Sequence, residues 1–250
     1  VLITGASETS TPEPTPTPQP APTLTPQPAP TPAPQPEPMP EANTLAEPIN
    51  FNCLISSSKI ISGLKITGSP CDEIIKGKAK DDVLFGRSGD DHLEGKSGND
   101  LLKGGRDSEF LRGGKGDDTL RGGHDNDTLR GGKGADRLIG HKGDDLLIGR
   151  QGNDVLRGRS GDDTIKGGQG DDIIKGGRGA DLIHLSRGQD QILDFKPQRG
   201  DRLISKNNFS FEVTQLDGNL ILTDVNNNTQ ITLHNISLNT ALTVQPELFS

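Results

Sequence analysis

Hydrophobic residues recur at one fixed phase over half of the chain. Between Gly68 and Leu193 a Leu or Ile stands at every ninth residue, and six residues rich in Gly and Asp precede each x-Leu-x run. The clearest segments read GGKGDDTLR (113–121), GGQGDDIIK (167–175) and GGRGADLIH (176–184). An x-Leu-x run predicts a short strand whose middle side chain points to one face and whose neighbours point to the other. The six residues before it predict a tight turn.

The nonapeptide repeats fourteen times without insertion or deletion. Position one is Gly in thirteen copies, position four is Gly in ten, position six is Asp or Glu in all fourteen, and position eight is Leu or Ile in all fourteen. Since one copy is a turn plus a strand, two copies form a closed coil of eighteen residues, and like positions stack about 4.8 Å apart. The position-six acids then form two rows along the two edges. One row is Glu73, Asp91, Glu109, Asp127, Asp145, Asp163 and Asp181. The other row is Asp82, Asp100, Asp118, Asp136, Asp154, Asp172 and Asp190.

These rows indicate calcium. Gly at positions one and four permits a positive φ, so the turn can aim its carbonyl oxygens inward. Carboxylate and carbonyl oxygens are hard ligands that suit calcium rather than zinc or copper. Stacked carboxylates repel one another unless a cation lies between them. The predicted metal ligands are Asp82, Asp91, Asp100, Asp118, Asp127, Asp136, Asp145, Asp154, Asp163, Asp172, Asp181 and Asp190, with Gly86, Gly95, Gly113, Gly122, Gly131, Gly140, Gly149, Gly158, Gly167 and Gly176.

The pattern G-G-x-G-x-D-x-U-x resembles the hemolysin-type calcium-binding (RTX) repeats. The resemblance implies an all-β fold, a right-handed parallel β-roll (β-solenoid), with one calcium ion bridging each pair of stacked turns. Seven acids per row leave six gaps per row, so about twelve ions is the upper limit and about ten are expected. Without calcium the alternative is a disordered Gly/Asp-rich segment, because fourteen Leu or Ile side chains are too few to order it. Metal binding is then part of the folding free energy.

The two rows are not equal. The row containing Asp136 has Gly at position four in six of its seven turns, with Lys80 as the exception. In the opposite row Cys71, Asp107 and Asp125 replace that Gly, and Glu replaces Asp twice. We expect tighter binding in the Asp136 row, and weak or empty sites beside Glu109, because Glu is one methylene longer.

The flanking segments divide the chain further. Residues 1–48 are expected to hold a signal-peptide remnant (VLITGAS, 1–7) and a disordered Pro/Thr-rich linker. Residues 49–67 are expected to form an N-terminal β cap, residues 68–193 the roll, and residues 194–250 a C-terminal β cap.

Within the C-terminal segment, the alternation of apolar and polar residues predicts strands at 209–214, 219–225 and 230–236. The segment 194–205 is similar to the one that often follows RTX repeats, and Asp194 and Asp201 are candidate ligands of a terminal calcium site. The last residues, 237–250, are a candidate type I secretion signal without a defining motif.

Composition narrows the class of protein. The net charge is −8, only 29% of residues are hydrophobic and 3% are aromatic, which excludes a large conventional core and fits a solenoid. Few aromatics and an acidic balance disfavour nucleic acid, and no stretch is long enough to span a membrane. Cys53 and Cys71 are one coil length apart and are candidates for a disulfide in an extracellular protein, the location that millimolar calcium also favours. Two unrelated thiols are the alternative.

Position nine suggests a partner. It is basic in eight copies: Lys76, Lys103, Arg112, Arg121, Arg130, Arg157, Lys166 and Lys175. Such outward ladders suit an anionic polysaccharide or another polyanion, and Arg121, Arg157 and Lys175 are expected on one sheet. A solvated face is the alternative.

No catalytic constellation is recognisable in the sequence. We therefore expect a secreted or surface-tethered, non-enzymatic structural or adhesive module that binds calcium. The alternative is the C-terminal targeting module of a larger secreted enzyme or toxin, and an ice-binding roll is a distant third because the outward positions are mostly charged.

Overall fold

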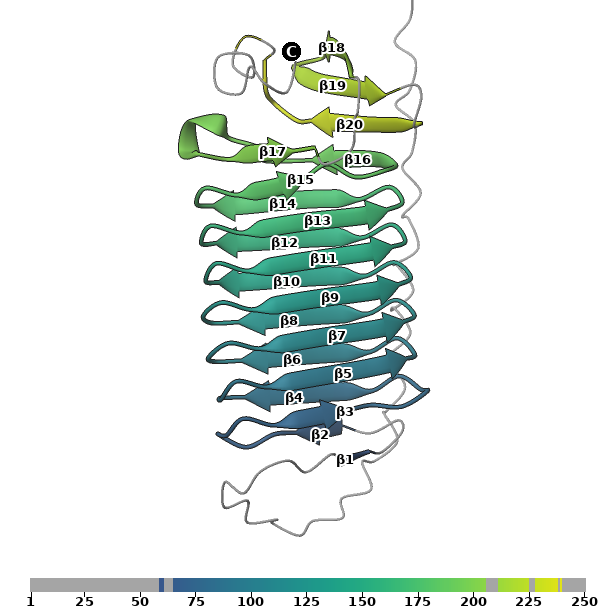
Figure 1. The fold of residues 1–250 in the computed structure, drawn as a ribbon, viewed down its shortest axis with the longest axis vertical. Helices are drawn as coiled ribbons and strands as arrows, with labels where there is room; N and C mark the ends of the chain where they lie inside the picture. The colour runs from purple at the N-terminus through teal and green to yellow at the C-terminus, as the bar shows by residue number, and fades with distance from the viewer. Residues whose placement is uncertain (1–58, 61–64, 206–210, 225–227, 238, 240–250) are drawn as a thin grey trace, which may run out of the picture. The chain divides into compact units, whose positions relative to one another are not determined.

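The computed structural model describes residues 59–60, 65–205, 211–224, 228–237 and 239. These residues form two stacked sheets, and successive strands of the repeats alternate between them (Figure 1). Each eighteen-residue coil therefore gives one strand to each sheet. The fold is an all-β parallel solenoid, as the nine-residue period predicts.

The first sheet has nine strands in the order β1-β3-β5-β7-β9-β11-β13-β15-β17. Its strands are β1 (Lys59–Ile60), β3 (Ile74–Lys76), β5 (His92–Ser97), β7 (Phe110–Lys115), β9 (Thr128–Lys133), β11 (Leu146–Gln151), β13 (Thr164–Gln169), β15 (Leu182–His184) and β17 (Arg202–Ile204). All neighbours in this sheet pair in parallel, and within the repeats the paired residues are eighteen apart.

The second sheet has eleven strands in the order β18-β19-β20-β16-β14-β12-β10-β8-β6-β4-β2. Its roll strands are β2 (Lys65–Thr67), β4 (Val83–Arg87), β6 (Leu101–Gly105), β8 (Thr119–Gly123), β10 (Arg137–Lys142), β12 (Val155–Ser160), β14 (Ile173–Arg178) and β16 (Gln189–Ile192). Arg121 and Arg157 both pair with Ile139, and Lys175 pairs with Arg157, so the three basic residues share this sheet as predicted.

The core is the row of position-eight side chains between the sheets. Every one from Leu84 to Ile183 is at most 1% exposed, whereas the neighbours on either side are partly or fully exposed, apart from Ile139 at 3%. The period-two alternation inside each short strand explains this, because only the middle residue can point inward.

The end of the repeats carries an antiparallel extension. Strands β18 (Glu212–Leu216), β19 (Asn219–Asp224) and β20 (Thr229–Leu233) form a meander. Strand β20 then pairs in parallel with β16, so the meander continues the second sheet edge to edge. A 3₁₀ turn, Pro197–Arg199, precedes β17.

The expectation that glycines at both positions one and four adopt a positive φ is wrong for position one. The positive-φ glycines stand at positions two and four, for example Gly132 (142°) and Gly134 (120°). Position one needs Gly for space instead, because a Cβ on Gly149 would collide with the Asp154 carboxylate and lie 2.6 Å from the Gly167 carbonyl oxygen.

Several expectations fall on residues outside the described ranges. These are the segment 1–7, the linker up to residue 48, most of the N-terminal cap, and the C-terminal residues 240–250. Cys71 is disulfide-bonded, but Cys53, the only other cysteine of the sequence, also lies outside the described ranges. The Cys53–Cys71 pairing therefore stays a prediction.

Candidate metal sites along two carboxylate rows

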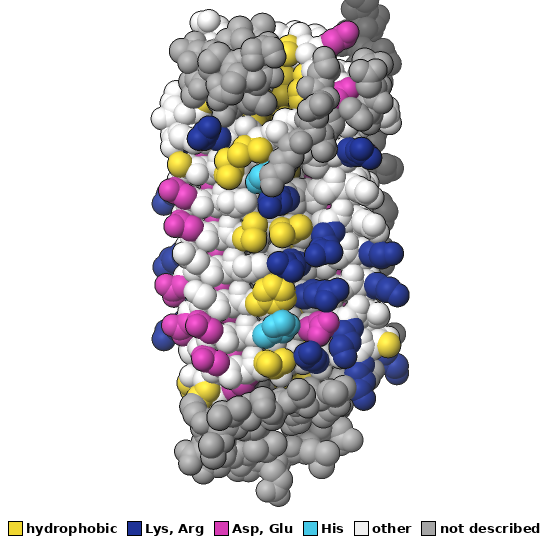
Figure 2. Space-filling view, viewed as in Figure 1, with side chains coloured by type: hydrophobic (Ala, Val, Ile, Leu, Met, Phe, Trp, Pro, Cys, Tyr) yellow, Lys and Arg dark blue, Asp and Glu magenta, His cyan; other side chains and the backbone are white. Residues whose placement is uncertain are grey.

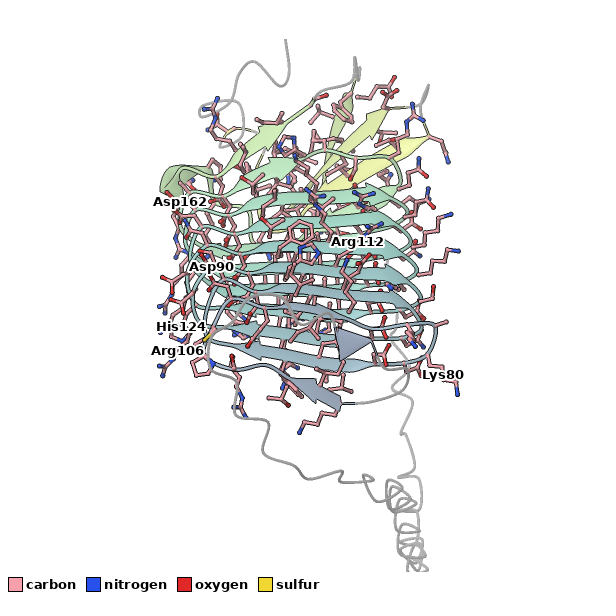
Figure 3. All side chains as sticks on the ribbon, turned by 60° about the horizontal axis from the view of Figure 1, so that its bottom comes forward. Lys80, Asp90, Arg106, Arg112, His124 and Asp162 are labelled. Atoms are coloured by element: carbon pink, nitrogen blue, oxygen red, sulfur yellow. The ribbon has the colours of Figure 1, made fainter. Side chains whose placement is uncertain are left out.

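The predicted acidic ligands lie in two buried rows, one along each edge of the roll. All twelve predicted Asp residues are between 0% and 2% exposed. Figure 3 shows the two edges: Asp90, Arg106, His124 and Asp162 mark the turns of one, and Lys80 marks the other. Burial of so many carboxylates requires partners, because an unpaired buried charge is costly.

Half of each carboxylate is satisfied by the backbone of the neighbouring coil. The N–H of Asp136 donates to Oδ1 of Asp154 at 2.8 Å, and the N–H of Asp154 donates to Oδ1 of Asp172 at 2.9 Å. The same bond links successive acids along the opposite row, as from Asp127 to Asp145. These ladders fix the position and rotamer of each carboxylate within its row.

The second oxygen has no partner. Oδ2 is buried without a hydrogen bond in Asp91, Asp100, Asp118, Asp127, Asp136, Asp145, Asp154, Asp163, Asp172 and Asp181. Each of these oxygens faces the position-one Gly of its own turn, and around Gly149 and Gly158 a carbonyl oxygen of the next coil is also close. Acceptor oxygens gathered without a donor are the chemistry that a hard cation satisfies, so the residues present fit calcium.

The pKa values of the buried carboxyl groups also indicate that positive charge is missing from the two rows. Burial raises the pKa of Asp136, Asp163 and Asp172 to about 8, and like charges in the row add to the shift. Burial also raises the pKa of Asp91, Asp118 and Asp145 to about 7, and that of Asp100, Asp154 and Asp181 to about 6. A cation between the carboxylates would reverse these shifts, because it favours the charged form.

The ends of one row differ from its interior. Asp82 Oδ2 accepts the N–H of Lys78 at 2.8 Å, and Asp190 Oδ2 accepts the hydroxyl of Ser186 at 2.8 Å. Both residues were predicted as ligands, but their second oxygens already have donors. The interior Asp residues therefore fit a cation better than these two.

The acidic row of Asp181 continues past the last repeat. The N–H of Asp181 donates to Oδ1 of Asp201 at 3.1 Å, so Asp201 takes the position-six place although it comes twenty residues later. Its Oδ2 accepts the N–H of Lys196 at 2.7 Å. Asp194 lies nearby and accepts the N–H of Gly176 at 3.0 Å. The structure thus brings the two predicted terminal residues to the end of this row, and a terminal calcium site there stays a prediction.

Glu109 departs most from the regular pattern of the two acidic rows. It is 2% exposed and both of its carboxylate oxygens lack a partner. Burial, together with the charge of Asp127, raises the pKa of Glu109. Its turn also holds Asp107 with φ of 76° at position four, a conformation that a non-Gly residue adopts at some cost.

Sequence reasoning missed a second ladder at position five. There the exposed side chain accepts the backbone N–H one coil later, as Asp144 Oδ1 does from Asp162 (2.7 Å) and Asn126 Oδ1 does from Asp144 (2.7 Å). The signal was present, because position five is Asp or Asn in ten of the fourteen copies. These residues hold the stacked turns from outside while the position-six acids hold them from inside.

Side chains alone do not complete a metal site. Among the described residues, no three His, Cys, Asp or Glu side chains come together to hold a metal ion. Calcium bound here would therefore need backbone carbonyl oxygens in addition to the carboxylates, which is ordinary for calcium. In the described part of the chain no helix is long and apolar enough to cross a membrane.

A family model for a calcium-binding repeat agrees with this geometry. The model of the RTX calcium-binding nonapeptide repeat (4 copies) matches residues 67–102, 103–138, 122–156, 130–165 and 157–192. These matches together cover half of the chain. No curated protein matches it. Among solved structures, the chain is similar to the extracellular lipase LipA from Serratia marcescens, with 23% identity and a TM-score of 0.37. That alignment covers 74% of this chain and 39% of the lipase, so the chain spans well under half of the lipase's length.

Proposed function

The chain belongs to the RTX calcium-binding nonapeptide repeat family, and on that premise we propose that it is a secreted or surface-tethered β-roll whose folding is driven by calcium. The observation that carries the proposal is the alignment of ten buried, unpartnered Asp Oδ2 atoms in two rows. Bound calcium supplies positive charge between stacked carboxylates that otherwise repel.

The interior residues of the two rows would hold the ions. Asp100, Asp118, Asp136, Asp154 and Asp172 would serve one edge, and their Oδ1 atoms accept backbone N–H groups of the preceding coil. Since each carboxylate is fixed on one side in the folded roll, its free oxygen has a defined orientation there. The position-one glycines leave the space into which that oxygen points.

We propose a structural or adhesive role without catalysis. The histidines serve the roll in unrelated ways: His92 stacks on Phe110 with ring centroids 4.7 Å apart, and His124 is exposed at a turn. An extracellular location agrees with the need for millimolar calcium to fill many sites of ordinary affinity.

A calcium titration followed by far-ultraviolet circular dichroism tests the proposal. The full chain should be disordered in chelator and gain its β signal in millimolar calcium, whereas equal magnesium should restore little, since magnesium demands a smaller and stricter octahedral site. A chelator-treated protein that keeps its full β signal would reject calcium-driven folding.

The second candidate is the C-terminal targeting module of a larger secreted enzyme or toxin. The gene sequence upstream of Val1 separates the two candidates. A signal peptide directly before Val1 supports the free-standing module, and a catalytic domain supports the second candidate.

A further inference from the structure

One face of the roll carries a hollow with a basic lining. The hollow has a volume of about 400 Å³ and crosses strands β5, β7, β9 and β11 of the first sheet. Its cations are Lys96, Arg112, Lys115, Arg130, Lys133 and Arg150, and Glu94 is its acidic member. Figure 2 shows Lys and Arg side chains gathered to one side of a face of the roll. We call this feature the basic groove.

The groove is a product of the repeat. Gly114 and Gly132 pair in register at position two and leave its floor without side chains. Arg112 and Arg130 pair in register on one side of that floor, and Lys115 and Lys133 on the other. These two cation columns therefore run parallel, about 4.8 Å per step along the sheet.

The ends of the floor are also basic. Lys96 pairs with Gly114, and Arg150 pairs with Gly132, so a cation closes each end of the pair of glycines. Both end residues adopt a positive φ, 82° and 93°. A long side chain is accommodated at these two positions, whereas a Cβ on Gly114 or Gly132 would lie 2.1 Å from a carbonyl oxygen of the preceding coil, so the floor stays open there.

Most of the charge in the groove is uncompensated. Among the described residues the two salt bridges are Lys76–Glu94 at 3.4 Å and Arg112–Glu94 at 3.7 Å. They leave Lys96, Lys115, Arg130, Lys133 and Arg150 without an acidic partner. The Arg130 guanidinium lies 5.0 Å over the Phe110 ring, which holds it in place, and its Nε has no hydrogen-bond partner. A protein with net charge −8 concentrates five unpaired cations here.

We propose that the basic groove binds a linear anionic polysaccharide. This inference rests on the proposed function, because the groove exists only in the folded roll. An unbranched chain of sugars places anionic groups at regular intervals, which matches two parallel columns of cations with an open floor. Hydroxyl groups of the sugars can also accept from, and donate to, the backbone and Gln151 at the rim.

Other polyanions fit less well. Single-stranded nucleic acid is normally held by aromatic side chains that stack on bases, and the groove is lined by none. An anionic membrane favours cations next to apolar side chains that insert, and the lining has no exposed large hydrophobic residue.

The binding test uses the full chain in excess calcium, with dextran sulfate as the probe and unsulfated dextran as its neutral control. The triple variant Lys115→Gln, Lys133→Gln, Arg150→Gln should bind dextran sulfate about tenfold more weakly, as expected for three lost exposed ion pairs. The charge-matched control is Arg121→Gln, Arg157→Gln, Lys175→Gln, which removes three cations from the other sheet and should weaken binding about threefold or less. Equal losses of dextran sulfate binding in both triple variants would overturn the groove. Binding would then depend only on the overall positive charge of the surface.

A second variant tests shape without changing charge. Gly132→Gln fills the floor, and because its Cβ would lie 2.1 Å from the Gly114 carbonyl oxygen the strand must shift. Gly123→Gln on the second sheet meets the Gly105 carbonyl oxygen at 2.2 Å and is the strain-matched control. Gly132→Gln should weaken binding to dextran sulfate more than Gly123→Gln does. Unchanged binding by Gly132→Gln would overturn the groove. So would tighter binding of the wild-type chain to single-stranded DNA or to anionic phosphatidylserine vesicles than to dextran sulfate.

Circular dichroism on each variant in calcium separates the two proposals. A chain that does not need calcium to fold but binds dextran sulfate through the groove would overturn the calcium proposal and support this one. A chain that folds with calcium but does not bind dextran sulfate would support the calcium proposal and overturn the groove.

Discussion

The backbone N–H of Asp136 donates a 2.8 Å hydrogen bond to Oδ1 of Asp154, the equivalent acid one coil later. The same carboxylates leave their Oδ2 atoms buried and unpartnered. The same hydrogen bond therefore stacks the coils and orients the candidate calcium ligands. An ion that binds the free oxygens also stabilises the ladder, which couples metal binding to folding along each row.

Replacing Asp136 by Ala should raise the calcium midpoint of folding more than replacing Glu109 by Ala. Asp136 loses both a ladder acceptor and a candidate ligand in the regular row, whereas Glu109 stands in a turn whose geometry already departs from the repeat. The midpoints are read from the β signal during calcium titration of each variant.

The matched control is Asp136→Asn, which keeps the Oδ1 acceptor and removes the charge. Its midpoint should rise as well, but its folded state should lose less stability than that of Asp136→Ala at saturating calcium. A larger midpoint shift in Glu109→Ala than in Asp136→Ala would contradict the ranking of the rows.

Acid should partly replace calcium. Burial raises the pKa of Asp136, Asp163 and Asp172 to about 8 in the metal-free roll, against about 4 in the unfolded chain. Groups with a raised folded pKa contribute stability that is present below pH 4 and is lost as pH rises through 8. Calcium-free protein in 0.15 M salt should therefore show more β signal at pH 4 than at pH 8. A signal that is equal or weaker at pH 4 would contradict the carboxylate burial.

The nine-residue period was sufficient to predict both sheets, the Leu core and the two acidic rows, because each follows from side-chain direction in a coil of eighteen residues. The reason for Gly at position one could not be predicted. It depends on the Asp154 carboxylate reaching back over Gly149, a contact that sequence spacing does not reveal. Only one column of the basic groove was predicted, the one formed by the basic residues at position nine. The second column, Lys115 and Lys133 at position three, comes from different copies and lies beside the first only in register.

Loss of one hydrogen bond from the ladder at position five should lower the stability of the roll only slightly. Asp144→Ala removes the acceptor of the Asp162 N–H, and because the site is exposed the folded roll should lose about 0.5–1 kcal/mol. Asp144→Asn keeps that acceptor and should be nearly neutral, as Asn126 at the equivalent place suggests. Thermal unfolding in saturating calcium measures both. A large loss in Asp144→Asn would mean that the exposed charge, rather than the hydrogen bond, holds the turn.

Gly149→Ala should damage both folding and calcium affinity. The added Cβ would collide with Asp154 Oδ2 and press on the Gly167 carbonyl oxygen at 2.6 Å, so the two acceptors cannot keep their places. We expect destabilisation of about 2–4 kcal/mol, in the range of overpacked buried sites, with a raised calcium midpoint. The control is Gly218→Ala in the turn between β18 and β19, where an added Cβ meets no atom within 4 Å. Its φ of 77° still costs about 1 kcal/mol, but the calcium midpoint should barely move because no carboxylate is displaced. If both variants shifted the midpoint equally, backbone strain rather than the displaced carboxylate would explain the effect, and the Asp154 oxygen would lose its assigned place beside the ion.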